Sequence, residues 1–152
     1  MVDPLYLDDI SAGDSFESET HEMTVENIVA YARQFDPQPF HTDPDAAKQT
    51  FFEGLAASGW HTAAVTMRLL VDAVPLAKGM IGAGGDIHWP TPTRPGDVLR
   101  VTATIEDIVP SSSKPGRAAV TMLSRTTNQH GELRQEFRCR LMAWQRDAEV
   151  QT

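Results

Sequence analysis

An aspartate and a histidine stand five positions apart in the segment Tyr31–His41, which reads Tyr-Ala-Arg-Gln-Phe-Asp-Pro-Gln-Pro-Phe-His. A carboxylate and an imidazole that meet at one place can hold a water molecule and move its protons, which is general acid/base chemistry. We therefore take Asp36 and His41 as the candidate catalytic residues. Gln38 lies between them, and its amide can orient one member of the pair by hydrogen bonding.

The backbone predicted around this pair would tune both groups. A helix over residues 24–35 should end at Asp36, because Pro37 pushes the preceding residue out of the α region. The helix dipole disfavours a negative charge at that end. His41 precedes Asp43-Pro44, the expected N-cap and first turn of another helix. Since a helix N-terminus disfavours a cation, we expect His41 to be neutral and able to accept a proton.

Three further candidates open the most apolar stretch of the chain. A helix is predicted from Ser58 to about Val74, with Ser58 as its N-cap. The free backbone N–H groups of Gly59 or Trp60 could then donate hydrogen bonds to an oxyanion at the helix N-terminus. A glycine at position 59 also lets a carbonyl group approach closely. Ser58, Gly59, Trp60 and Gln38 are thus candidate substrate-binding residues, and capping alone is the competing role for Ser58.

The remaining pattern predicts the elements that must position these groups. Apolar residues recur at helical spacing between Thr24, a plausible N-cap, and Phe35. The helix from Ser58 is apolar nearly all round, which is typical of a helix buried inside a fold. The chain after Gly79 reads as strand, with the clearest alternation in Val98–Ile108, Ala118–Thr127 and Leu133–Gln145, a turn at Asn128–Gly131 and a loop at Pro110–Gly116. We expect one α+β domain over residues 1–152, in which an antiparallel sheet wraps around a long buried central helix.

Composition excludes several classes of function. The formal net charge of −8 argues against nucleic acid binding, which needs a basic face. One cysteine, Cys139, cannot form an internal disulfide, so we expect a reducing, cytoplasmic setting. The N-terminus lacks the layout of a signal peptide, and the stretch from Trp60 to Val74 is too short to span a membrane. No Cys/His cluster has metal-ligand spacing, so no metal site is expected.

At these residues the chain resembles the MaoC-like dehydratases, the (R)-specific enoyl-CoA hydratase branch of the hotdog-fold superfamily. That family carries an aspartate, two positions on an asparagine, then a proline, a hydrophobic residue and a histidine. Here these places hold Asp36, Gln38, Pro39, Phe40 and His41. The likeness extends to the helix opening at Ser58-Gly59 and to Arg94-Pro95-Gly96-Asp97 before a strand, so it covers roughly residues 31–108. Gln38 for asparagine and the bulky Trp60 depart from the pattern, and a tryptophan near the acyl path would shorten or redirect it.

The resemblance implies a hotdog fold and the reversible addition of water across the 2,3 double bond of an enoyl-CoA, giving an (R)-3-hydroxyacyl product. It implies that Asp36 and His41 hold the water, with no cofactor besides the coenzyme A of the substrate. It also implies a homodimer, or a dimer of dimers, in which edge strands join into a continuous sheet.

Several alternatives stay open at this point. Asp36 and His41 could be a structural pair that closes a loop, and which of them is the base is undecided. A thioesterase or a non-catalytic acyl-CoA-binding module would use the same fold. Basic side chains that could meet the phosphates of coenzyme A, with solvent exposure as the default for each, are Lys114, Arg117, Arg94 and Arg125.

Overall fold

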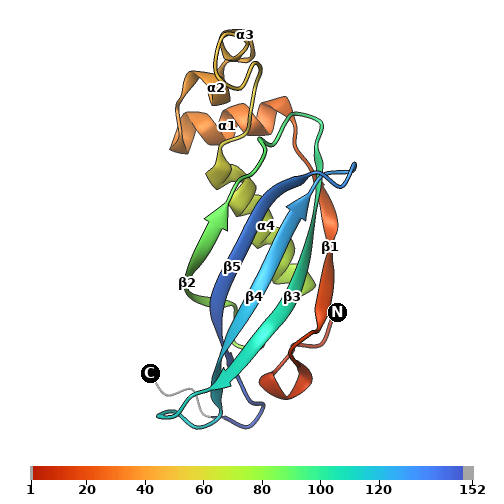
Figure 1. The fold of residues 1–152 in the computed structure, drawn as a ribbon, viewed down its shortest axis with the longest axis vertical. Helices are drawn as coiled ribbons and strands as arrows, with labels where there is room; N and C mark the ends of the chain where they lie inside the picture. Colours follow the sequence, from red (N-terminus) through yellow and green to blue (C-terminus); the bar gives the residue numbers. More distant parts are fainter. Residues whose placement is uncertain (1, 149–152) are drawn as a thin grey trace.

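The computed structural model describes residues 2–148, which form one antiparallel sheet with helices on one side and at one end (Figure 1). The strands of these residues are β1 (Ser15–Glu22), β2 (Ile81–His88), β3 (Val98–Pro110), β4 (Arg117–Thr127) and β5 (Leu133–Trp144). Their order across the sheet is β1-β3-β4-β5-β2, so β1 and β2 are the two edge strands. The helices are α1 (Val25–Phe35), α2 (Pro39–Thr42), α3 (Pro44–Ala47) and α4 (Gly59–Ala73), preceded by a short 3-10 turn at Leu7–Asp9.

The meander of β3, β4 and β5 follows the predicted alternation. In β3, Leu99, Val101, Ala103 and Ile105 are buried while their neighbours face outward. The turn between β4 and β5 is closed by Asn128, whose side-chain oxygen accepts hydrogen bonds from the backbone N–H groups of His130 and Glu132. The three strands and the turn between the last two are therefore confirmed, with strand bounds shifted by one or two residues.

Strand β1 was not predicted, because its sequence has no apolar alternation. It reads Ser-Phe-Glu-Ser-Glu-Thr-His-Glu, and only Ser18 in it is buried. The pairing of β1 with β3 is irregular between Glu17 and Thr20. There the hydroxyl of Ser18 accepts a hydrogen bond from the backbone N–H of Val101 at 2.9 Å. A side chain thus replaces a ladder bond, which a pattern of hydrophobicity does not reveal.

Helix α4 packs against β1, β3 and β5 and carries the core contacts of the sheet. Its inward face, with Val65, Leu69 and Leu70, is buried. Its outward face is exposed although it is also apolar, with Trp60, Met67 and Val71 about half accessible. The sheet of one chain therefore covers one side of α4 only. Within the described residues, no helix combines the length and the apolar character needed to cross a bilayer.

Helices α1, α2 and α3 form a cluster at one end of the sheet, next to the N-terminus of α4 (Figure 1). Thr24 caps α1 as predicted, since its hydroxyl accepts a hydrogen bond from the N–H of Asn27 at 3.1 Å. Asp43 likewise caps α3 and accepts from the N–H groups of Asp45 and Ala46. Between them, residues 39–42 form the short helix α2, which the sequence did not predict, so His41 lies within a helical turn.

Candidate active site

Asp36 is fixed where α1 ends. Its backbone N–H donates to the carbonyl of Ala32 at 2.8 Å, and its own carbonyl accepts from the N–H of Gln38 at 2.8 Å. The helix stops here because Pro37 follows, as predicted. The side chain is mostly buried, with 19% of its surface exposed. The end of α1 therefore delivers the carboxylate to the cluster at the start of α4.

The imidazole of His41 is held in one orientation. Its Nδ1 lies 2.7 Å from the carbonyl oxygen of Ala56, in the segment that leads into α4. A carbonyl oxygen can only accept a hydrogen bond, so Nδ1 carries the hydrogen and the neutral ring has its free lone pair on Nε2. That Nε2 lies 3.4 Å from Oδ2 of Asp36. Asp36 and His41 are thus neighbours. Nε2 of His41 faces the carboxylate, while Nδ1 is hydrogen-bonded to the backbone.

Two side chains donate hydrogen bonds to the Asp36 carboxylate. The Ser58 hydroxyl donates to Oδ2 at 2.7 Å, and the Gln38 amide donates to Oδ1 at 2.5 Å. Burial raises the pKa of Asp36, but these two hydrogen bonds, together with the attraction of His41 in its protonated form, outweigh burial, so the pKa lies below its ordinary value. The sequence-based expectation that the helix end disfavours the ionised form is therefore wrong in its net effect. Asp36 is a stable carboxylate.

The predicted cap at Ser58 does not form. Ser58 occupies the N-cap position of α4, but its hydroxyl is directed to Asp36 and caps no backbone N–H. The carbonyl of Ser58 accepts from the N–H groups of His61 and Thr62. Within residues 2–148, no partner accepts from the backbone N–H groups of Gly59 and Trp60. The start of α4 thus offers unpaired donors, with the polarity that favours a negative charge.

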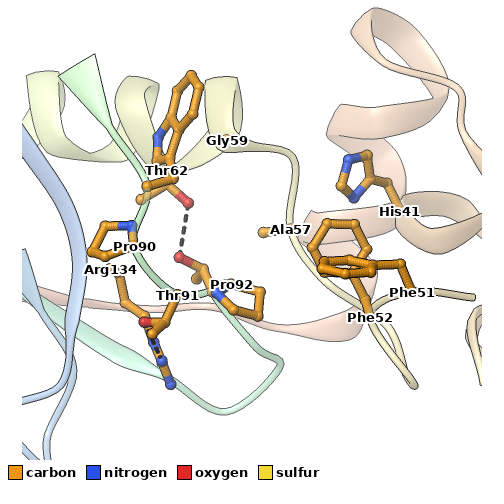
Figure 2. Close-up of a pocket in the computed structure, with 12 residues that line it drawn as sticks. His41, Phe51, Phe52, Ala57, Gly59, Thr62, Pro90, Thr91, Pro92 and Arg134 are labelled. Atoms are coloured by element: carbon orange, nitrogen blue, oxygen red, sulfur yellow. Dashed lines mark hydrogen bonds between the residues drawn. The ribbon is translucent and has the colours of Figure 1, made fainter. Parts of the chain in front are cut away.

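A cavity of about 380 Å³ opens beside His41 and Gly59 (Figure 2). In Figure 2 the His41 ring approaches from one side, with Phe51 and Phe52 below it, and Pro90, Thr91, Pro92 and Arg134 form the opposite wall. Thr62 and Thr93 also line this cavity and are hydrogen-bonded to each other at 2.9 Å. Asp36 does not line the cavity, but its carboxylate contacts His41, which does. We call this space the His41 cavity.

Trp60 does not line the His41 cavity, contrary to its predicted place in a substrate site. It is 59% exposed and packs edge-on against Trp89, with ring centroids 5.2 Å apart. Trp89 is the tryptophan that lines the cavity. A Cβ atom at position 59 would lie 2.7 Å from its indole, so close packing of Trp89 requires the glycine there.

Most of the cavity wall was not identified from the sequence. Phe52, Thr62, Thr93 and Arg134 come from four separate segments and carry no local motif. Of the residues that line this cavity, only His41 and Gly59 were candidate site residues in the sequence. Cavity walls of this kind depend on tertiary contacts, which spacing along the chain does not record.

Arg94 was a candidate for contacting coenzyme A phosphates, and the structure gives it another role. Its guanidinium donates to the backbone carbonyls of Phe52, Gly54 and Leu55 at 2.6–3.2 Å. It thus holds the loop that carries Phe52 against the His41 cavity. Arg125 is paired with Glu136 on the sheet surface. Lys114 and Arg117 lie at the far end of the sheet from α2, around the hairpin of β3 and β4 (Figure 1).

A buried ion pair supports the opposite wall of the cavity. Arg134 donates to both carboxylate oxygens of Asp97, at 2.8 and 3.3 Å, and to the hydroxyl of Thr91 at 2.9 Å. Burial raises the pKa of Asp97, but hydrogen bonds from Arg134, the Arg94 backbone and Asn128 hold it below its ordinary value. The pair fixes the Thr91 segment in place. Among the described residues, no group of three or more His, Cys, Asp or Glu side chains could hold a metal ion.

The arrangement has the parts needed to add or remove water at a polarised double bond. A proton acceptor, His41 Nε2, faces a carboxylate and borders a cavity. An unpaired N–H at Gly59 borders the same cavity and can stabilise an oxyanion.

Comparison with known proteins shows the family of this chain and structures that share its fold. Residues 10–128 match the family model described as MaoC like domain. A crystal structure of a MaoC-like dehydratase from Rhodospirillum rubrum is 52% identical, covering 93% of this chain and 98% of that chain, with a TM-score of 0.92. The unliganded R-hydratase PhaJ1 from Pseudomonas aeruginosa is 22% identical, covering 98% of this chain and 95% of that chain, with a TM-score of 0.77.

A curated relative adds sequence support over most of the chain. The uncharacterized protein YdeM of Bacillus subtilis (strain 168) is 29% identical over 126 residues, which are 81% of this chain and 87% of that protein.

Proposed function

This chain belongs to the MaoC-like domain family, and from that premise we propose that it is an (R)-specific enoyl-CoA hydratase. Its fold is the hotdog fold that the resemblance implied, and the family supports a hydratase or dehydratase activity. The proposed reaction is the reversible addition of water to a 2-enoyl-CoA, in which coenzyme A enters only as part of the substrate. The hydratases among the structural neighbours support the reaction class.

The observation that carries the proposal is the geometry of His41. Its Nδ1 is committed to the Ala56 carbonyl, so Nε2 is the nitrogen that can accept a proton, and it lies 3.4 Å from Asp36 Oδ2. A water molecule bound by both residues would donate one hydrogen bond to His41 Nε2 and the other to the Asp36 carboxylate. The lowered pKa of Asp36 makes its carboxylate a weak proton acceptor. We therefore assign proton removal to His41 and orientation of the water to Asp36.

The proposed step balances without an added reactant. As the water oxygen forms its bond to the β-carbon, one O–H bond breaks and the proton moves to His41 Nε2. The electron pair of the double bond shifts toward the thioester carbonyl and gives an enolate. The imidazolium, stabilised by the Asp36 carboxylate, then returns the proton to the α-carbon. Because one group removes and returns the proton, we expect both additions on the same face.

The start of α4 would stabilise the enolate. The N–H of Gly59 borders the His41 cavity and has no partner among the described residues. It lies at the positive end of a 15-residue helix, which favours a developing oxyanion. Ser58 would not contact the enolate in this arrangement. Its hydroxyl instead positions the Asp36 carboxylate.

Two substitutions test the proposal. We expect His41→Ala and Asp36→Asn each to lower kcat for crotonyl-CoA hydration by about 10²–10⁴-fold, since each removes a group that handles the water. His130→Ala is the matched control, because His130 is exposed in the turn between β4 and β5. Circular dichroism and Tm should show that the fold is kept. Near-normal hydration by folded His41→Ala or Asp36→Asn protein would refute the assignment.

We also propose that two copies associate through β2. This edge strand is exposed along nearly its whole length, and edge strands of this kind are normally paired or covered. The exposed apolar side chains of α4, Trp60, Met67 and Val71, would be covered by the same contact. A second copy is the occupant we assign because antiparallel pairing of β2 with itself extends the sheet symmetrically.

A further inference from the structure

A second space lies beside the first turns of α4, next to the His41 cavity. It measures about 330 Å³ and lies between α4, β2 and β5. Its lining is mainly apolar and includes Met67 and Leu70 of α4, Ile87 of β2 and Phe137 of β5. We call it the distal groove. In the proposed dimer the second copy would cover the outer side of this groove, where Trp60 and Met67 are exposed. An apolar chain that continued from the His41 cavity past Gly59 would then be buried in the groove.

The indole of Trp89 stands between the two spaces. It lines the His41 cavity together with Gly59, against which it is packed without room for a Cβ atom. Its other neighbours belong to the distal groove. The ring meets Trp60 edge-on at 5.2 Å, and the indole N–H donates to Gln135 Oε1 at 2.9 Å. Trp60 and Gln135 both line the distal groove. Trp89 therefore forms the partition between the two.

The hydrogen bond to Gln135 keeps this partition in place. Gln135 is 1% exposed, and its Nε2 has no partner in the described part of the chain. An indole N–H can only donate, so Gln135 must present its oxygen to Trp89. If the indole swung away, the Gln135 side chain would lose its one hydrogen bond while remaining buried. Leaving a buried polar group unsatisfied is costly, which opposes that movement.

Part of the wall of the His41 cavity is polar. Thr62 and Thr93 are nearly fully buried and pair through their hydroxyls, and Arg134 is tied to Asp97. These polar groups are less favourable neighbours for methylene groups than the distal groove is. The direction past Trp89, toward the distal groove, is therefore the more favourable one for an apolar chain.

We propose that Trp89 determines substrate specificity by closing the His41 cavity to longer acyl chains, which restricts the enzyme to short enoyl-CoA substrates. This inference rests on the proposed function, because it concerns the acyl group of that substrate. It differs from the sequence-based expectation, which placed a chain-shortening tryptophan at Trp60.

The test compares two substrates and two substitutions at Trp89. We expect the wild-type protein to favour crotonyl-CoA over trans-2-octenoyl-CoA by at least about tenfold in kcat/KM, and Trp89→Ala to raise kcat/KM for the octenoyl substrate about tenfold, through burial of the added methylenes. Trp89→Phe, which keeps a ring at the partition, should retain a preference close to that of the wild type. Equal use of both substrates by the wild type, or an equal change for both in Trp89→Ala, would overturn the proposal.

A binding measurement separates this proposal from the proposed reaction. Calorimetry with saturated butyryl-CoA and octanoyl-CoA needs no turnover. Tighter octanoyl-CoA binding by Trp89→Ala than by the wild type, with butyryl-CoA binding little changed, would support the partition even if no enoyl-CoA were hydrated. In that case the reaction would be wrong and the partition right. Unchanged octanoyl-CoA binding in Trp89→Ala would contradict the partition even if crotonyl-CoA were hydrated. Binding of neither compound by either protein would contradict both the partition and the proposed function.

Discussion

Ser58 links the two helices that carry the proposed chemistry. It is fully buried, and its hydroxyl joins the first residue before α4 to the carboxylate that ends α1. This one hydrogen bond has two consequences. It lowers the pKa of Asp36, and it leaves the N-terminus of α4 without a side-chain cap, so that backbone donors stay open toward the His41 cavity.

Removing the Ser58 hydroxyl should raise the pKa of Asp36. Burial of the carboxyl raises its pKa, and one of the hydrogen bonds that lowers the pKa would be lost. We expect ¹³C NMR titration of the carboxyl to give a wild-type pKa below the ordinary 3.8 and a higher value in Ser58→Ala. Ser124→Ala is the matched control, since this buried serine donates to the carbonyl of Phe137 instead. An unchanged Asp36 pKa in Ser58→Ala would contradict the assigned role.

The sign of this shift also fixes a dependence of stability on pH. A carboxyl whose pKa is lower in the folded state stabilises the fold at pH values above its unfolded pKa. That contribution is lost as the pH falls through the folded-state pKa. Because the hydroxyl lowers the folded-state value, the contribution should be smaller in Ser58→Ala and should disappear at a higher pH.

The residues of the candidate site were predicted from the sequence, but the direction of the Asp36 pKa shift was not. Asp36, Gln38 and His41 were named from their spacing and Ser58 as the start of the apolar helix, and the structure brings the four together. The direction of the Asp36 pKa shift was missed, because the dipole at the end of a helix is a local effect whereas the Ser58 hydroxyl comes from 22 residues away. Their roles in catalysis stay predictions.

Among the elements, the loop between α3 and α4 depends on a single side chain. Arg94 binds three successive or nearly successive carbonyls of that loop, at Phe52, Gly54 and Leu55. Glu53 has a positive φ of 55°, so this turn is held in a conformation that its residue does not favour. The clamp therefore supports the position of Phe52 on the wall of the His41 cavity.

We expect Arg94→Ala to lower the free energy of unfolding by about 2 kcal/mol, because it removes charged hydrogen bonds to partly buried carbonyls. Arg125→Ala is the control, since the Arg125–Glu136 pair lies on the surface and such pairs contribute about 0–1 kcal/mol. Chemical denaturation of both variants measures the difference. Equal losses of stability would show that the clamp adds nothing beyond an ordinary surface charge.

Secondary structure with a strong periodic pattern was predictable, and the elements that depend on tertiary contacts were not. Helix α4 and the meander of β3, β4 and β5 were found from their patterns and lie within one or two residues of the predicted bounds. Strand β1 was not predicted because it is an edge strand whose sequence shows no apolar alternation. Helix α2 escaped because four residues are too few to show a helical period.

In the whole molecule, two features remain exposed in a single chain. These are the apolar outer face of α4 and the unpaired edge of β2. The sequence predicted a helix buried on most sides, yet Val71 is 45% exposed in one chain. A second copy paired at β2 would cover both features.

We expect Val71→Glu to shift the protein toward monomer, because it places a charge in the proposed contact. Val109→Glu is the matched control, since this valine is also exposed but lies on β3, away from α4 and β2. Light scattering coupled to size-exclusion chromatography gives the mass against 16.7 kDa for one chain. A wild-type monomer, or dimers that survive Val71→Glu unchanged, would exclude this interface.

The proposed addition of water by His41 and Asp36 is tested by the product that the wild-type protein forms from crotonyl-CoA in deuterated water. If His41 and Asp36 add water as proposed, the product is (R)-3-hydroxybutyryl-CoA with one deuterium at the α-carbon, on the same face as the new hydroxyl. Chiral chromatography and NMR identify it. Release of free coenzyme A without hydration, or a hydroxyacyl product of the (S) configuration, would contradict the account.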